Sequence, residues 1–170
     1  MRLFVQNGFD ATTLDEVAAA ADVSRRTLLN YFGSKEEIVF SAKADFPRMI
    51  VAAIENRPAD EPLLDMVENA FADLAARHTS PEALALARLI HSTPALSAGD
   101  QAKYERVERL LAAALAGRKG LPETDIACRV VAATAIGILK MSTKAWLEGD
   151  GRTPEAFGHA AFSALREAAA

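Results

Sequence analysis

A short segment around residue 27 concentrates side chains that can form hydrogen bonds with nucleobases. The Arg25 guanidinium suits the edge of guanine or a phosphate, and the Asn30 amide suits adenine. Thr27 and Leu29 can contact the methyl group of thymine. Adjacent arginines on a helix are more often a solvated face, so this chemistry needs a scaffold that presents it to a groove. The residues predicted to contact DNA are Thr13, Ser24, Arg25, Arg26, Thr27, Leu29, Asn30, Tyr31 and Lys35.

The residues before this segment predict a helix that would support it. Thr13 and Glu16 have the spacing of a capping box, so a helix is expected to begin at Thr13. Apolar residues follow along 14–21 at spacings of three and four, which gives a narrow stripe on one helix face. Another element must cover that stripe.

A turn and a second helix follow directly. Asp22 tolerates the left-handed backbone that a sharp turn often needs, at a cost of about 1 kcal/mol, and Ser24 is a strong N-cap. The second helix is expected over 25–32, with Leu28 and Phe32 facing inward. The polar residues of the same helix then face outward, as a helix in a major groove requires.

The sequence after residue 32 predicts the end of this helix and the start of another. Gly33 suits a C-terminal cap, and Ser34 with Glu37 forms a second capping box. Lys35 would then lie at a helix N-terminus, where free N–H groups and the helix dipole favour a phosphate oxygen.

This arrangement resembles the tetracycline-repressor (TetR) family of bacterial transcriptional regulators over residues 1 to about 45. The resemblance rests on Leu3-Phe4, Gly8-Phe9, Thr12-Thr13, Val17-Ala18, Val23-Ser24, Thr27-Leu28, Tyr31-Phe32 and Ser34-Lys35-Glu36. It implies that Thr13 and Lys35 hold phosphates while residues 25–31 lie in or beside the groove. It also implies double-stranded operator DNA as a partner.

Three departures from the family pattern affect what is expected. Asp22 replaces the usual small glycine of the turn, while Arg26 and Leu29 replace a small and an aromatic residue, so base preference is expected to differ. The chain opens at Met1, where this family normally has a longer first helix preceded by a basic arm, and the sequence leaves open whether residues ahead of Met1 complete that helix. A shortened first helix would cover the module less well.

Composition is that of a soluble protein and excludes several other classes. The chain has 170 residues, 51% of them hydrophobic and 25% charged, and a net charge of −4. An acidic chain is unsuited to coating nucleic acid, although a few cations on one helix suffice for a specific reader. The lone Cys128 is compatible with a reducing cytoplasm, and no apolar run reaches the roughly 18 residues that span a bilayer. We therefore expect a cytoplasmic protein that makes no membrane contact.

Proline and glycine divide the rest of the chain into predicted helices, and no alternating β-like run appears. The helices are expected at 34–56, 62–77, 81–92, 98–116, 122–147 and 154–168, with Pro47 kinking or interrupting the first near Phe46. The sequence thus predicts an all-α fold: a helix-turn-helix DNA-binding domain at 1–40, then a helical bundle for effector binding and dimerisation at 41–170.

The last two predicted helices suggest a homodimer. Residues 126–139 are apolar nearly all round except for Arg129, so both sides of this helix need a cover. The family resemblance points to a four-helix interface from the same two helices. The residues predicted for the dimer interface are Val130, Ile138, Phe157, Ala161, Phe162 and Leu165. A two-fold dimer would place two reading helices on successive major-groove faces, roughly 34 Å or a multiple apart.

Polar and flexible residues on the apolar helices are candidates for a small-molecule site. The predicted pocket residues are Met49, Met66, Phe71, Arg88, His91, Tyr104, Thr134, Met141 and Trp146. Each has an ordinary alternative, since methionines at helical spacing mostly fill cores. The run 88–96 also loosely resembles the C-terminal domain of mycofactocin-type regulators, which would imply a lipid-like or acyl-thioester effector.

The sequence predicts no enzyme, no cofactor and no metal site. It has no glycine-rich phosphate loop, no metal-ligand spacing and no nucleophile with an identifiable base. The favoured hypothesis is a repressor released from a palindromic operator by a small, apolar effector. The alternative is a ligand-binding helical dimer that has lost DNA binding because its first helix is truncated. The sequence leaves open the operator, the effector, the regulated genes, and repression against activation.

Overall fold

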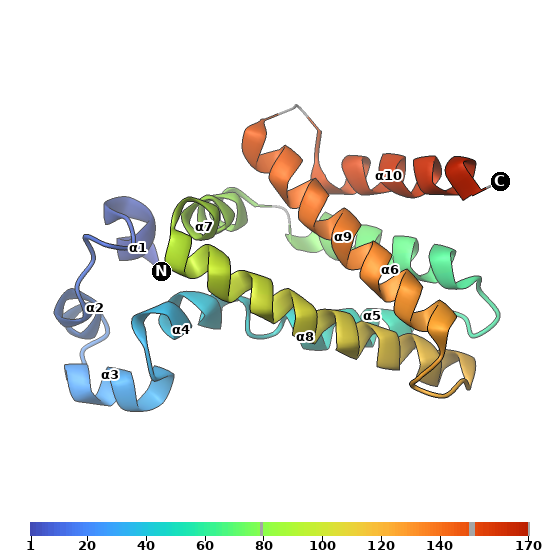
Figure 1. Ribbon diagram of the computed structural model, residues 1–170. Coiled ribbons are helices and arrows are strands. Elements are labelled where there is room, and N and C mark those ends of the chain that lie inside the picture. Colours follow the sequence, from blue (N-terminus) through green and yellow to red (C-terminus); the bar gives the residue numbers. More distant parts are fainter. Residues whose placement is uncertain (79, 150–151, 170) are drawn as a thin grey trace. The chain divides into compact units, whose positions relative to one another are not determined.

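The computed structural model describes residues 1–78, 80–149 and 152–169, and every regular element in these ranges is a helix (Figure 1). The predicted all-α fold is therefore confirmed. The chain forms two compact units: a first unit of Met1–Asp45 and Ala85–Ala102, and a second unit of Phe46–Leu84 and Lys103–Ala170. The first unit thus contains more than the predicted domain at 1–40, because a later segment of the chain joins it.

The first unit is built from short helices near the N-terminus. They are α1 (Arg2–Asn7), α2 (Leu14–Ala20), α3 (Arg25–Phe32) and α4 (Lys35–Phe40), followed by the 3-10 turn η1 (Ser41–Lys43). The later part of α7 (Pro81–Ser92) and the first part of α8 (Pro94–Lys119) complete the unit.

The core of the first unit is rich in aromatic side chains. Phe4 is fully buried, and its ring stacks on that of Phe9 with the centroids 5.9 Å apart. Leu28 from α3, Val39 from α4 and Leu96 from α8 belong to the same buried cluster. Short helices bury little surface by themselves, so the contribution of α7 and α8 enlarges a core that would otherwise be marginal.

Helix α8 and the end of α4 approach closely within this unit. A Cβ added at Gly99 would lie 2.9 Å from the ring of Phe40, so the absence of a side chain permits the contact. The Lys43 ammonium forms a salt bridge with Asp100 at 3.0 Å, and both side chains are largely buried. The segment that follows α4 is therefore fastened to α8.

The second unit contains the longer helices. They are α5 (Phe46–Glu55), α6 (Leu63–His78), α9 (Ile126–Glu148) and α10 (Pro154–Ala169), together with the remainder of α8. Helix α10 packs on both α6 and α9, and α5 packs on α6 (Figure 1). Side chains with no exposed surface include Ile54, Met66, Val67, Leu111, Leu115, Cys128, Ala132 and Ala135.

The predicted helix boundaries agree with the structure in most places. Helices α7 and α10 begin at Pro81 and Pro154 as predicted, and the segment 34–56 is interrupted before Phe46. Helix α9 begins at Ile126 instead of Pro122, because the Asp125 carboxylate accepts a hydrogen bond from the Cys128 N–H at 2.9 Å and caps the helix there. The predicted start of α8 at residue 98 was late, since it begins at Pro94.

Helix α9 is the one described helix that is long and apolar enough to cross a membrane by length and composition. The prediction that no segment meets this criterion was therefore wrong. Core helices of soluble proteins meet it too, and Cys128, Ala132, Ala135 and Ile136 of α9 lie in the core of the second unit.

Candidate nucleic-acid interface and ligand cavity

The helix-turn-helix is held by the caps that its sequence predicts. Thr13 Oγ1 accepts a hydrogen bond from the Glu16 N–H at 3.2 Å, and the Glu16 carboxylate accepts one from the Thr13 N–H at 2.7 Å. This hydrogen bond from the Thr13 backbone lowers the pKa of Glu16. Ser24 Oγ accepts from the Thr27 N–H at 3.0 Å and caps α3. Both helix starts are therefore fixed by local polar contacts.

The turn between α2 and α3 has the expected left-handed residue. Asp22 has a φ of 53° and is the only non-glycine residue with positive φ in the described part of the chain. Gly33 ends α3 with a φ of 82°. These two positions set where α3 begins and ends.

Helix α3 presents its polar residues to solvent and buries one anchor. Leu28 is only 5% exposed and lies in the core of the first unit, whereas Tyr31 is 82% exposed. Leu29 is half-buried, so less of its side chain is available than the sequence suggested. The exposed residues among the predicted contacts are Thr13, Ser24, Arg25, Arg26, Thr27, Asn30 and Tyr31.

A carboxylate that was not among the predicted contact residues lies near the first arginine of α3. The Arg25 guanidinium is 3.6 Å from the Asp15 carboxylate of α2, and the two side chains are 58% and 72% exposed. An exposed ion pair contributes at most about 1 kcal/mol, so it can orient the guanidinium without trapping it. The helical periodicity of α2 places Asp15 on its solvent side, which is the feature that could have identified it.

Lys35 is positioned by contacts with the loop after α1. Its ammonium lies 4.4 Å from the centroid of the Phe9 ring and 3.5 Å from the Asp10 carbonyl oxygen. Ser34 Oγ caps α4 by accepting from the Glu37 N–H at 3.1 Å. The cation is thus held beside the helix-turn-helix by an aromatic face.

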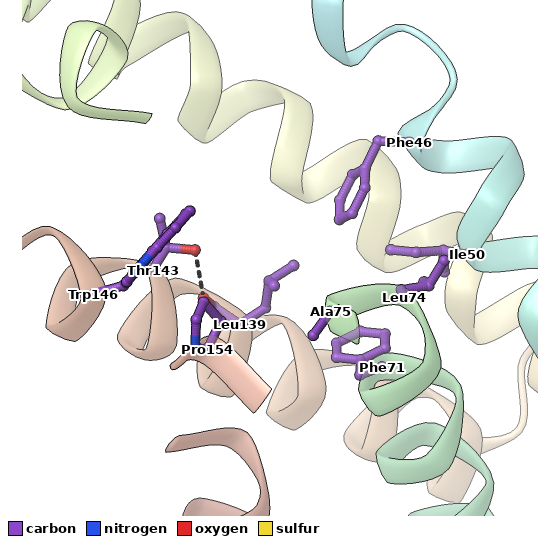
Figure 2. Close-up of a pocket in the computed structure, with 9 residues that line it drawn as sticks. All are labelled: Phe46, Ile50, Phe71, Leu74, Ala75, Leu139, Thr143, Trp146 and Pro154. Atoms are coloured by element: carbon purple, nitrogen blue, oxygen red, sulfur yellow. Dashed lines mark hydrogen bonds between the residues drawn. The ribbon is translucent and has the colours of Figure 1, made fainter. Parts of the chain in front are cut away.

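The second unit contains an apolar cavity of about 150 Å³. Figure 2 shows Phe46 of α5 and Leu139 of α9 extending toward this space from opposite sides, with Trp146 and Thr143 further along α9. The Thr143 hydroxyl donates a hydrogen bond to the Leu139 carbonyl at 3.0 Å. The other described lining residues are Ile50, Phe71, Leu74, Ala75 and Pro154.

The structure brings together only some of the residues predicted for the pocket. Phe71 and Trp146 line this cavity, and Met49 lines a separate polar cavity beside α5. Arg88 and His91 are exposed in the first unit, so they do not line it. The predicted pocket residues were mostly polar or flexible ones on apolar helices, but apolar side chains from three helices form most of the wall.

The remaining predicted pocket residues also lie elsewhere. Met66 has no exposed surface and fills the core, and Met141 is 57% exposed. Tyr104 and Thr134 are partly buried and are absent from the described lining. These residues do not line the apolar cavity, and a ligand contact at any of them stays a prediction.

The residues predicted for the dimer interface divide into two groups. Ile138 and Phe162 are 8% and 1% exposed and lie in the core of their own chain, so they are not available to a second subunit. Val130 is 58% exposed, while Phe157, Ala161 and Leu165 are half-buried. Ile126 and Met141, which the interface prediction omitted, are 75% and 57% exposed on α9.

The lone thiol and the acidic residues do not form a reactive site in the described residues. Burial raises the pKa of the Cys128 thiol to about 11, so it carries no thiolate at neutral pH. The described part of the chain has no group of three or more His, Cys, Asp or Glu side chains that could hold a metal ion.

Comparisons with known proteins agree with this geometry. Residues 1–42 match the family described as bacterial regulatory proteins, tetR family, and residues 61–170 match the MftR C-terminal domain. The HTH-type transcriptional regulator TcmR of Streptomyces glaucescens is 29% identical over 155 residues, covering 86% of this chain and 69% of TcmR. The proposed mycofactocin biosynthesis regulator MftR of Mycobacterium tuberculosis is also 29% identical over 155 residues, covering 88% of this chain and 77% of MftR.

A solved structure supports the fold. A proposed TetR-family transcriptional regulator from Mesorhizobium loti MAFF303099 superposes with a TM-score of 0.65 at 22% identity, covering 96% of this chain and 89% of that one. With the capped helix-turn-helix, the exposed face of α3 and the two family matches in agreement, this chain belongs to the tetR family of DNA-binding transcriptional regulators and carries an MftR C-terminal domain.

Proposed function

We propose that the protein is a dimeric repressor that leaves a near-palindromic operator when a small, apolar effector occupies the cavity of the second unit. The observation that carries the proposal is the division of α3 between a buried anchor, Leu28, and an exposed polar face. Regulators of this family bind DNA, act as dimers and respond to small molecules. The repressor role, the operator and the effector are specific to this proposal.

The polar face of α3 has the chemistry for reading base pairs. Arg25 can bind guanine through two parallel hydrogen bonds, and Asn30 can bind adenine in the same way. The Asp15 carboxylate holds the guanidinium near α2 until DNA replaces it. Because that pair is exposed, the exchange costs little.

Contacts with the phosphate backbone would fix the register of α3. We assign them to Thr13 at the start of α2 and to Lys35, whose ammonium lies beside the Phe9 ring. Phosphate contacts position a protein on DNA and make its affinity depend on salt, whereas base contacts select the sequence.

The exposed apolar side of α9 supports the dimer. Ile126, Val130 and Met141 recur at helical spacing and are each more than half exposed. A second copy would cover this stripe, with the half-buried Phe157 and Leu165 of α10 beside it. We predict that Val130→Asp lowers dimer affinity at least about tenfold in sedimentation equilibrium, with an unchanged helical circular dichroism spectrum. A stable Val130→Asp dimer of wild-type affinity would contradict this interface.

The cavity supports the effector role. Its described lining is apolar apart from Thr143 and the indole N–H of Trp146, which suits a small apolar molecule. A ligand shifts DNA affinity only if it binds two conformations of the protein with different affinity. We propose that the effector favours the conformation that does not fit the operator. The relatives are transcriptional regulators, so we also propose a cytoplasmic protein without enzymatic activity or a cofactor.

The test is DNA binding to the intergenic region upstream of the gene, measured by fluorescence anisotropy at several salt concentrations. We expect sequence-selective binding that weakens as salt increases, and footprinting over a near-palindrome. Arg109→Ala is a matched control, because it removes an exposed arginine of α8 that lies outside the helix-turn-helix. A reporter gene downstream of the same DNA tests repression: deletion of the regulator should raise expression.

Two results would overturn parts of this proposal. If neither this chain nor one extended at its N-terminus binds its upstream DNA selectively, the protein is a ligand-binding dimer and not a regulator of that site. If it binds but deletion lowers reporter expression, the repressor assignment is replaced by an activator.

A further inference from the structure

A second cavity adjoins the apolar cavity. It has a volume of about 170 Å³ and shares Phe71, Ala75, Leu139 and Pro154 with the first cavity. Each space alone is about the size that holds a benzene-sized molecule. Together they suit one longer ligand with a different chemical group at each end, so we call them the apolar chamber and the polar chamber.

The polar chamber differs from the apolar chamber in its charged groups. Glu68 of α6 and Glu155 of α10 line it, together with His159. The Glu68 carboxylate contacts His159 Nδ1 at 2.8 Å and also accepts a hydrogen bond from Arg166. Arg166 is shared with the carboxylate of Asp65, so its positive charge is already compensated. Carboxylates therefore outnumber cations among these described groups.

The uncharged polar groups of the two chambers also favour a hydrogen-bond donor. The hydroxyls of Thr143 and Ser142 donate to the carbonyls of Leu139 and Ile138, so their oxygens keep only accepting lone pairs. One N–H of the Asn69 amide donates to the Glu61 carboxylate, which leaves the carbonyl as an acceptor and the second N–H as a donor. A ligand group inside the chambers thus meets more acceptors than donors, since the uncharged donors are the Trp146 indole N–H and the second Asn69 N–H.

The helix start at the polar chamber offers little to an anion. The N–H groups at the beginning of α10 would attract negative charge, but Thr153 Oγ1 already accepts from the Ala156 N–H at 3.2 Å. The Glu155 carboxylate occupies the same first turn and would repel an anionic ligand group.

We infer that the effector is an apolar amine: a molecule whose hydrocarbon or aromatic body fills the apolar chamber and whose protonated amine lies in the polar chamber near Glu68 and Glu155. A neutral alcohol with the same body binds more weakly, because it donates a single hydrogen bond and carries no charge. A carboxylate with the same hydrocarbon body has the lowest affinity, because Glu68 and Glu155 repel its negative charge. This inference rests on the effector role proposed above, because it identifies the class of ligand for that cavity.

The chain carries its own probe for this ligand. Trp146 is its only tryptophan and lines the apolar chamber, so its fluorescence reports occupancy directly (Figure 2). Decylamine, decanol and decanoate share one hydrocarbon body and differ only in the head group. We expect decylamine to bind with an affinity on the order of tenfold higher than decanol and more than that over decanoate. Thermal stabilisation by each ligand gives a second readout that does not depend on the indole.

Two variants test separately the contact with the ligand's head group and the space available for its hydrocarbon body. Glu155→Gln should reduce the preference for decylamine over decanoate several-fold, while decanol affinity stays unchanged. Glu105→Gln removes an exposed carboxylate of α8 outside the lining and should change nothing. Ala75→Leu adds bulk where the two chambers meet, so it should weaken binding of decylamine more than binding of benzene, which needs only one chamber. Ala76→Leu, an exposed neighbour on α6, is the matched control.

The outcomes distinguish this inference from the proposed function. If decanoate binds as tightly as decylamine, or if no member of the series changes Trp146 fluorescence or the melting temperature, the amine assignment is wrong even when operator binding is normal. If decylamine binds as expected but the protein does not bind its upstream DNA, the ligand class stands and the regulator proposal fails. Release of operator DNA by decylamine and not by decanoate would support both.

Discussion

The two units carry their candidate sites in different physical forms. In the first unit the site is a surface: exposed side chains on α3, held by caps and a turn that lie within a few residues of them. In the second unit the site is a space, enclosed by side chains from α5, α6, α9 and the start of α10. The surface site depends on which side chains stay exposed. The cavity depends on side chains from different helices that leave a space between them.

This difference determines how each site responds to substitution. Side chains on the surface of α3 contribute little to stability, so they can change base preference with little effect on the fold. Most side chains around the apolar chamber also pack in or against the core, so their substitution is expected to change ligand preference and stability together. The predictions below test this contrast, beginning with the largest expected effect.

Phe162→Ala is expected to be the most disruptive of these changes. The ring is 1% exposed in the core of the second unit and also lines the polar chamber. Removing a buried phenylalanine costs about 3–5 kcal/mol, from lost burial and the cavity left behind. We expect lower stability in urea unfolding and loss of ligand binding measured by Trp146 fluorescence.

Hydrogen exchange shows whether that loss is confined to one unit. Faster exchange in α6, α9 and α10, with unchanged exchange in α2 and α3, would support independent responses. Equal acceleration in the helix-turn-helix would contradict the contrast. Ala164→Gly on the exposed side of α10 is the control, with an expected cost of about 1 kcal/mol from helix propensity alone.

The same contrast explains what the sequence could and could not predict. The helix-turn-helix was predictable because the Thr13–Glu16 box, the Ser24 cap and the left-handed Asp22 are local, and the structure contains each of them. The apolar chamber was not, since Phe46 and Leu139 are far apart in sequence and neither has a polar group that distinguishes it from core. Burial of Ile138 instead of exposure was also beyond prediction, because a helix that is apolar all round has no periodicity to show its outer face.

The long-range contacts of the first unit could not be predicted from local sequence patterns either. Gly99 and Leu96 on α8 contact the helix-turn-helix core, although more than fifty residues separate them from α4. A sequence pattern identifies a helix face but not which distant face covers it. Long-range partners therefore came only from the three-dimensional structure.

Arg25→Ala is expected to have the next largest effect, and it acts on DNA binding instead of stability. Loss of a guanidinium that reads a base should cost about 1–3 kcal/mol on the preferred operator and much less on DNA altered at that one base pair. Anisotropy titrations against a set of single-base operator variants measure this directly. Urea unfolding should be unchanged, because the side chain is 58% exposed.

Lys35→Ala is the matched comparison for a phosphate contact. It should weaken binding to all operator variants alike and reduce the slope of log affinity against log salt by about 1. If Arg25→Ala and Lys35→Ala weaken every sequence equally, the assignment of base and phosphate contacts is wrong.

Ser34→Ala should have a smaller effect, and it should act on stability and not on DNA sequence preference. Its hydroxyl caps α4 without belonging to the proposed DNA surface, and loss of a serine cap costs about 1 kcal/mol. We expect a modest fall in the stability of the first unit and unchanged base preference. Ser97→Ala, at an exposed position within α8, should cost less than about 0.5 kcal/mol. Equal costs for the two serines would show that the cap contributes nothing.

The smallest expected effect is a pH dependence that comes from the first capping box. The Thr13 backbone N–H lowers the pKa of Glu16 in the folded protein, so the ionised carboxylate stabilises α2 above the unfolded pKa of about 4.3. That stabilisation is lost as the pH falls through the lower, folded-state pKa. The difference in stability between the wild type and Glu16→Gln should therefore be largest near neutral pH and vanish in acid.

This last prediction also tests whether α2 depends on its own end more than on the distant bundle. Hydrogen exchange in α2 is the suitable measurement, because global unfolding would average over both units. Glu105→Gln on α8 should show no such pH-dependent change in α2. A stability difference for Glu16→Gln that stays constant from neutral to acidic pH would mean that the glutamate acts through packing of its side chain, and the surface of the first unit would then share the non-local character of the second.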